Sequence, residues 1–210
     1  MNPANEASSD NHTVSTQDLE HSVTSRVARY TDLRPYKDSF KNSNGVPPEA
    51  MRLMSPDKVM PIMAPDGWEG RSKLAPVRGA PGLTITLAEC PPGDRAGLHK
   101  HSAAVENFFC LEGEFEILWG EQGQYSTRLF PLDFVSVPAG IYRDFRNAGT
   151  SLGRLLVMIQ PAQGDLQDTV YHAASTGEQI DKLWGREVRD AMAQIGIQFG
   201  EPPQASNAKG

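Results

Sequence analysis

Apolar and polar residues alternate in short stretches along the middle of the chain, and turn residues separate these stretches. In residues 114–119, for example, Phe115, Ile117 and Trp119 alternate with polar neighbours. A period of two is typical of strands with one buried face. It predicts strands at residues 82–88, 98–102, 106–111, 114–119, 125–130, 134–137, 142–146 and 154–159. Many short strands in sequence indicate an all-β sandwich or barrel.

Two turns in this region contain the glycine that is typical of tight hairpins, at residues 111–114 and 120–123. We expect each turn to join two paired strands.

The flanking segments lack this alternation and divide the chain. Residues 1–25 are rich in small polar residues and are predicted to be disordered. Residues 26–76 scatter apolar residues among prolines, which favours an irregular arm that packs on the barrel or on a partner subunit. Residues 77–162 form the predicted β-barrel. They are followed by a C-terminal extension at residues 163–200 and a loose tail at residues 201–210.

One helix is predicted within the C-terminal extension, at about residues 177–195. Apolar residues recur there at helical spacing, and Ser175 with Glu178 forms a capping box at its start.

Two histidines and a glutamate lie close together in the predicted strand region. His99 and His101 point to the same face of a strand, and a hairpin would bring Glu106 back toward them on one wall. Imidazole nitrogen and carboxylate oxygen suit a divalent metal ion, and three ligands leave coordination positions open for chemistry. Fe(II) is the expected ion, with Mn(II), Ni(II) or Zn(II) as alternatives.

Composition narrows the classes of partner. The formal net charge is -6 and no basic stripe is present, which argues against nucleic acid. No segment is apolar enough for a secretory signal or a membrane span. The two cysteines, Cys90 and Cys110, are expected to be reduced thiols. We therefore expect a cytoplasmic protein that binds a small molecule.

The segment that contains the two histidines and the glutamate resembles the first motif of the cupin superfamily. That motif is a glycine, five residues, His-x-His, three or four residues, Glu, six residues and a glycine. Each position of the motif is filled, by Gly93, His99, His101, Glu106 and Gly113.

The second cupin motif is matched only in part, around the segment 138–140. Asn147 fits that motif, but Leu132 stands in place of its glycine and Arg143 in place of its histidine. Altogether the resemblance covers about residues 80–160.

The resemblance implies an all-β jelly-roll (double-stranded β-helix) barrel with the metal in its mouth, here with an irregular N-terminal arm and a C-terminal helix. It also implies a homodimer, and it suggests a small quercetinase-like or other dioxygenase-like cupin, within a superfamily that also includes decarboxylases, isomerases, lyases and binding proteins. In most metal-binding cupins the second-motif histidine is a fourth ligand. Arginine has no lone pair for a metal, so Arg143 cannot replace it.

Three roles for Arg143 are open at this point. It can anchor an anionic or enolate group of a substrate beside a three-ligand metal site. It can pair with Glu106 and leave the barrel free of metal. It can also lie exposed at the rim.

Strand parity predicts further site residues. Counting by twos from Glu106 adds Phe108 and Cys110 to the pocket lining, and counting from Arg143 adds Phe145 and Asn147. Tyr142 is a candidate catalytic donor to a bound oxygen. We expect a packing or surface role for His172.

The leading functional hypothesis is a dioxygenase that uses His99, His101 and Glu106 as metal ligands. A metal-dependent isomerase, lyase or decarboxylase is the second. The third is a metal-free barrel that binds a small molecule without turnover.

Overall fold

The computed structural model describes residues 15–40, 45–56, 58–67, 71–79, 81–161 and 168–200. Most of the predicted disordered segment and the whole predicted tail lie outside these residues.

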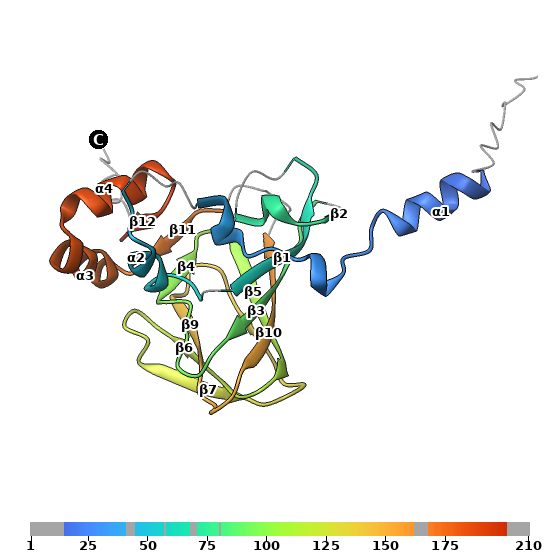
Figure 1. The fold of residues 1–210 in the computed structure, drawn as a ribbon. Helices are drawn as coiled ribbons and strands as arrows, with labels where there is room; N and C mark the ends of the chain where they lie inside the picture. The colour runs from blue at the N-terminus through green and yellow to red at the C-terminus, as the bar shows by residue number, and fades with distance from the viewer. Residues whose placement is uncertain are drawn as a thin grey trace, which may run out of the picture.

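Two six-stranded sheets form the body of the protein (Figure 1). The first sheet runs β2-β1-β3-β10-β5-β8, with strands Val77–Gly79, Lys58–Pro65, Thr84–Cys90, Gly153–Pro161, Ala104–Glu112 and Phe134–Val137. The second runs β12-β11-β4-β9-β6-β7, with strands Gln198–Phe199, Val170–His172, His99–His101, Arg143–Asn147, Phe115–Trp119 and Tyr125–Leu129. The predicted all-β jelly roll is confirmed, but the two sheets do not close into a barrel.

The main core lies between the sheets and arises from the predicted alternation. In β5, for example, Glu106, Phe108 and Cys110 are buried while the residues between them are partly exposed. Inward residues from both sheets form one apolar cluster, which includes Phe115, Phe145 and Leu155. Phe145 packs edge to face against Phe108 and Phe115, a favoured geometry for aromatic rings.

The two predicted hairpin turns have different outcomes. Residues 120–123 join β6 to β7, which pair antiparallel as expected. Residues 111–114 join β5 to β6, but these strands belong to opposite sheets. The turn therefore carries the chain across the core, because β5 pairs with β8 and β10 instead.

The N-terminal arm is partly a strand. Strand β1 pairs antiparallel with β3, and the pairing register shifts between Pro61 and Met63. A strand tolerates proline at a bulge, because the pairing is already interrupted there and the missing N–H removes no hydrogen bond between the strands. The prolines predicted an irregular segment here, whereas the structure has a strand, and the bulge explains how the strand accommodates proline. The rest of the arm contains α2 (Pro48–Arg52) and three short 3₁₀ helices, η1 (Tyr30–Asp32), η2 (Tyr36–Phe40) and η3 (Arg71–Leu74).

The C-terminal extension contains two helices where one was predicted, α3 (Ala174–Trp184) and α4 (Arg186–Gln194). Gly185 separates them with φ +91°, a conformation that glycine adopts readily. The predicted capping box is not used, because α3 starts after Ala173 without a side-chain cap.

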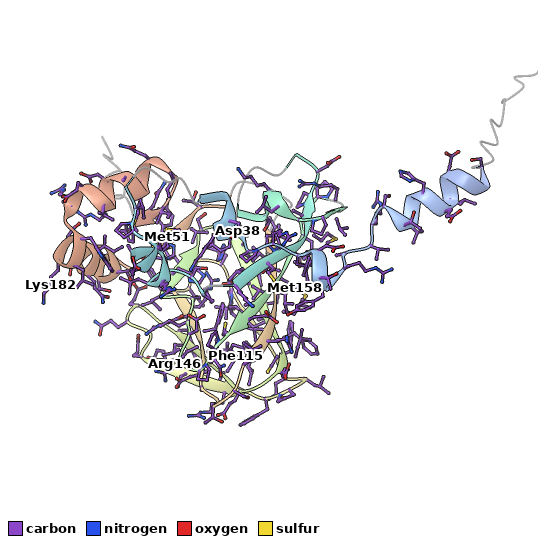
Figure 2. The ribbon with its side chains drawn as sticks, in the orientation of Figure 1. Asp38, Met51, Phe115, Arg146, Met158 and Lys182 are labelled. Carbon is purple, nitrogen blue, oxygen red and sulfur yellow. The ribbon has the colours of Figure 1, made fainter. Side chains whose placement is uncertain are left out.

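Helix α2 of the arm packs on these C-terminal helices. Met51 and Met54 share an apolar cluster with Ile180, Met192 and Ile197. Figure 2 labels Met51 where the arm meets the C-terminal helices. The two extensions therefore form one apolar unit beside the sheets.

Helix α1 (Thr16–Thr24) occupies part of the segment that was predicted to be disordered. Its cap is local, because the Ser15 hydroxyl accepts a hydrogen bond from the Asp18 backbone N–H. The helix extends away from the rest of the molecule (Figure 1).

None of the helices in the described part of the chain combines the length and the apolar character that crossing a membrane requires.

Gly97 holds the arm close to the strand that carries the histidines, and its replacement tests this packing. Gly97 has φ +76°, and a Cβ there would overlap the carbonyl oxygen of Leu53. Gly93 has φ +80° with open space around it. We expect Gly93→Ala to lower the free energy of unfolding by about 1–2 kcal/mol, from the left-handed backbone alone. Gly97→Ala should lower it further in urea denaturation, and equal losses would contradict the tight contact.

Glu89 fastens the arm to the outer face of the first sheet. Its Oε1 accepts hydrogen bonds from the Tyr30 hydroxyl at 2.7 Å and from Arg154 Nε at 2.8 Å, and Lys58 Nζ lies 3.5 Å from Oε2. Burial raises the pKa of Glu89, but these partners outweigh it and hold the pKa below 4.5.

The lowered pKa predicts a pH-dependent contribution to stability. The carboxylate should stabilise the fold fully above pH 4.5, its ordinary pKa, and this contribution should vanish as the pH falls through the lowered folded value. We therefore expect Glu89→Gln to be less stable than the parent at pH 7, with the difference shrinking below pH 4.5 in urea denaturation. A difference that does not change with pH would contradict this role.

Candidate metal site

The three predicted ligands meet between the two sheets. His99 and His101 lie on β4 and are both buried, with Lys100 between them facing the other way. Glu106 lies on β5 in the opposite sheet. The expectation of three ligands on one wall is therefore corrected, because the chain crosses from one sheet to the other between His101 and Glu106.

The ligand atoms converge on one point. Nε2 of His99 lies 3.4 Å from Oε2 of Glu106, and Nε2 of His101 lies 3.6 Å from the same oxygen. One ligand atom from each residue lies within 4.8 Å of the others. Among the residues that the structure describes, this is the one group with metal-ligand composition and spacing.

Both imidazoles are held in the tautomer that a metal requires. Nδ1 of His99 lies 2.8 Å from the Gly97 carbonyl oxygen, and Nδ1 of His101 contacts Oδ2 of Asp168. Because a carbonyl and a carboxylate can only accept, each Nδ1 must carry the proton. In the neutral rings the lone pairs are therefore on Nε2, directed at Glu106.

Glu106 supplies a negative charge that the protein leaves without a hydrogen bond. Its Oε2 is buried and has no hydrogen-bond partner among the described residues. Burial raises the pKa of Glu106, but His101 and His99, whose rings attract the carboxylate when they are protonated, and the Arg143 guanidinium outweigh it and bring the pKa to about 2. The group is therefore a carboxylate at neutral pH.

These features fit a divalent metal ion. Two nitrogen lone pairs and an unpartnered carboxylate oxygen point at one another, an arrangement that is repulsive unless a cation lies between them. Nitrogen and oxygen ligands in this number suit Fe(II), Mn(II), Ni(II) or Zn(II). His99, His101 and Glu106 would hold the ion.

Arg143 lies next to Glu106 and is fully buried. It is the direct cross-strand neighbour of His99, so it occupies the backbone position of a fourth ligand. Its Nη2 donates to the carbonyl oxygens of Val137 and Pro138, at 3.3 and 2.7 Å, and its Nε lies 3.6 Å from Glu106 Oε2. That separation is an ion pair rather than a hydrogen bond. The exposed rim position is excluded.

A cavity of about 540 Å³ opens beside these ligands. Its walls come from the arm, the sheets and the C-terminal extension, and they are mainly apolar. The lining includes Met51, Met54, Val59, Leu83, Phe145, Val157, Ile159, Ile195 and Ile197, with a few polar groups from Tyr36, Ser55, Thr84, Thr86 and Asp168. A mainly apolar cavity with few polar groups is typical of small-molecule sites.

Of the residues predicted to line this pocket, Phe145 does so. Phe108 and Cys110 point inward as parity predicts, but they lie in the core rather than at the cavity wall. Asn147 closes a turn by donating to the carbonyl oxygens of Cys90 and Ser151. Parity gives the face of a strand but not the depth, which explains the difference.

The structure places Tyr142 and Arg143 outside the lining of the cavity. The Tyr142 ring lies 5.1 Å from Lys100 Nζ, so it contacts the side chain that faces away from the ligands. Arg143 is not among the described residues that line the cavity, because the carbonyls of the facing sheet hold its guanidinium. The structure thus supports Arg143 as a partner of Glu106 and places it outside the described cavity lining.

Asp168 is the site residue that the sequence did not reveal. It lies 67 positions from His101, and its Oδ1 accepts from the backbone N–H groups of Ala103 and Ala104 at 3.0 and 3.2 Å. Burial raises the pKa of Asp168, but the bond to His101 and these N–H groups outweigh it and lower the pKa. The contact depends on the pairing of β11 with β4, which no local pattern shows. His172 packs against the His99 ring in the same pairing.

Comparisons with known proteins agree with the motif residues. Residues 86–159 match the family model described as the cupin domain. No curated protein matches the chain.

Several solved structures are similar to part of the chain. One is a sugar phosphate isomerase of the cupin superfamily from Silicibacter pomeroyi, which is 20% identical to this chain. The match covers 63% of this chain and 73% of that chain, with a TM-score of 0.43. The cupin domain of Cnp3 from Schizosaccharomyces pombe is 18% identical, with 49% and 64% covered and a TM-score of 0.37. A predicted oxalate decarboxylase from Thermotoga maritima is 23% identical, with 37% and 65% covered and a TM-score of 0.35. For the last two, the match spans less than two thirds of that structure's own length.

The Asp168–His101 contact predicts a measurable effect on metal affinity. In Asp168→Asn, Oδ1 can still accept from Ala103 and Ala104, but an amide NH₂ would face His101 Nδ1. The proton would then move to Nε2 and block the ligand position. We expect metal affinity to fall about 10–100-fold in a chelator competition, with unchanged folding. Ser102→Ala is the control, because it removes only a long contact of the Ser102 hydroxyl with Asp168 Oδ1, at 3.5 Å, and leaves the contact between Asp168 and His101 in place. Metal affinity in Asp168→Asn equal to that of the parent would contradict the role.

Proposed function

The chain belongs to the cupin superfamily, and on this premise we propose that it is a metal-dependent dioxygenase that acts on a small, mainly apolar organic molecule. The observation that carries the proposal is the unpartnered Oε2 of Glu106, which faces two imidazole lone pairs at the wall of an apolar cavity.

The three protein ligands would leave coordination positions open toward the cavity. Two histidines and one carboxylate are typical of non-haem Fe(II) oxygenases, in which substrate and O₂ share the open positions. A bound Fe(II) would supply redox and Lewis-acid chemistry at this point, so no organic cofactor would be needed.

The residues of this chain would do the remaining work. Gly97 and Asp168 keep the imidazoles in the binding tautomer. Arg143 places a buried positive charge next to Glu106, which keeps that residue a carboxylate and favours an anionic or enolate group nearby without contacting it. The apolar walls would exclude water and favour a substrate with an apolar carbon frame. The hydroxyls of Thr84 and Thr86 would offer that substrate a few hydrogen bonds.

A metal-dependent isomerase, lyase or decarboxylase is the second candidate, because the same ligands would support Lewis-acid chemistry. The lining argues against a phosphorylated substrate such as the one named for the Silicibacter pomeroyi protein. Among the lining residues that the structure describes, Lys73 is the one lysine or arginine, and its side chain is exposed. A phosphate would need several cationic or N–H donors.

Oxygen consumption by the Fe(II)-loaded protein tests the proposal. The probes are a catechol, a flavonol and a 1,3-diketone, each of which presents two oxygen atoms on a mainly apolar frame. We expect O₂ uptake with at least one probe, and its loss in His99→Ala together with loss of bound metal. His172→Asn is the matched control, because His172 contacts His99 but is outside the ligand set.

Two outcomes would contradict the dioxygenase. Undiminished turnover in His99→Ala would exclude the metal mechanism. Turnover under strict anaerobiosis would select Lewis-acid chemistry instead. Metal analysis of Arg143→His adds a third check, since metal found only in this variant would favour the metal-free barrel.

A further inference from the structure

Two threonines interrupt the apolar wall of the cavity at a distance from the metal ligands. Thr84 and Thr86 both line the cavity, although the residues are only 4% and 7% exposed. They are two positions apart on β3, so both side chains point to the same face of the first sheet. Neither hydroxyl makes a hydrogen bond to another residue that the structure describes. Two nearly buried hydroxyls therefore face the cavity without a partner from the protein.

The choice of threonine at these positions is unfavourable in an empty cavity. A hydroxyl in an apolar wall lowers stability unless it has a hydrogen-bond partner. Valine has nearly the same shape as threonine and would complete the apolar wall that Val157 and Ile159 form beside them. The two hydroxyls thus point to a polar partner that enters through the cavity.

The pairing register gives the position of these hydroxyls relative to the metal ligands. Ile159 on β10 is the direct neighbour of Glu106 on β5 and of Thr84 on β3, so the three residues form one row across the sheet. Figure 1 shows these strands next to one another. Adjacent strands lie about 4.8 Å apart, which places Thr84 about 10 Å from Glu106. Val157 occupies the corresponding position beside Thr86, so an apolar stretch separates the hydroxyls from the ligands.

We propose that Thr84 and Thr86 form a second polar subsite, which binds an uncharged oxygen group of the substrate about 10 Å from the metal ligands. The substrate would carry oxygen donors for the metal at one end and a hydroxyl or carbonyl group at the other, with an apolar ring system between them. This inference rests on the proposed function, because the metal fixes the first end of the substrate.

The charge of the lining favours an uncharged group at this subsite. A buried carboxylate or phosphate needs cationic partners. Lys73 is the one lysine or arginine among the described lining residues, and it is exposed. A threonine hydroxyl can both donate and accept a hydrogen bond, which suits a hydroxyl or a carbonyl oxygen.

Binding of three flavonols to the Zn(II)-loaded protein tests the subsite. Zinc has no redox chemistry, so binding is measured without turnover. The first flavonol has no hydroxyl on its pendant ring, the second has one at the para position, far from the chelating oxygens, and the third has one at the ortho position, close to them. We expect the para isomer to bind about five- to tenfold more tightly than the first flavonol, the gain of one hydrogen bond. The ortho isomer should show no gain.

Variants of the threonines assign this gain to their hydroxyls. Thr84→Val removes a hydroxyl at nearly constant shape, so the para isomer should lose most of its advantage while the unsubstituted flavonol binds as before. Thr86→Val should reduce the advantage as well, whereas Thr84→Ser keeps the hydroxyl and should preserve it. Thr169→Val is the matched control, because Thr169 also lines the cavity but follows Asp168 at the ligand end.

Three results would overturn the subsite. The first is equal affinity of the para and ortho isomers, which would leave the hydroxyls to water alone. The second is an advantage that survives in Thr84→Val/Thr86→Val. The third is a Zn(II)-loaded protein that binds none of the three flavonols. Failure of the dioxygenase is distinguishable, because the Fe(II)-loaded protein would then consume no O₂ while the Zn(II)-loaded protein still prefers the para isomer.

Discussion

A buried carboxylate oxygen without a hydrogen bond is the constraint on which the site depends. Burying such a charge is unfavourable unless cations compensate it. Oε2 of Glu106, on the first sheet, faces His99, His101 and Arg143 on the second sheet, each within 3.6 Å, and Arg143 is the permanent cation among them. The sheets must therefore pack in one register for the charge to be balanced, and the position of the site is tied to the fold of the core.

Arg143 shows how a substitution in a motif changes the chemistry without disrupting the fold. Histidine at this position would add a ligand, whereas arginine extends past the metal position to the carbonyls of Val137 and Pro138 on the facing sheet. Its charge remains close to the ligands, and Nη2 makes hydrogen bonds to those carbonyls, whereas Nε and Nη1 are buried without a hydrogen-bond partner among the described residues. Arginine thus replaces a metal ligand with a fixed positive charge. One more coordination position is left open for exogenous ligands.

The parts of the structure that depend on local pattern were predictable from the sequence. The alternation along β5 and β6 identified the strands, and the spacing of His99, His101 and Glu106 identified the ligands. Residues that act through distant pairing were not predictable. Asp168 reaches His101 only because β11 pairs with β4, and Pro61 is tolerated in β1 only because the register shifts there. Gly185 splits a helix that its apolar spacing made continuous, because its positive φ turns the backbone.

The shared apolar cluster of α2 and the C-terminal helices has a consequence for how ligands reach the cavity. Met51 and Met54 come from one end of the chain and Ile197 from the other, and all three are both cluster members and cavity lining. This part of the cavity wall is thus formed jointly by two segments that are distant in the sequence, rather than by one loop that moves alone. Thermodynamic linkage then requires that a ligand which contacts both segments stabilises the packing of the arm against the C-terminal extension.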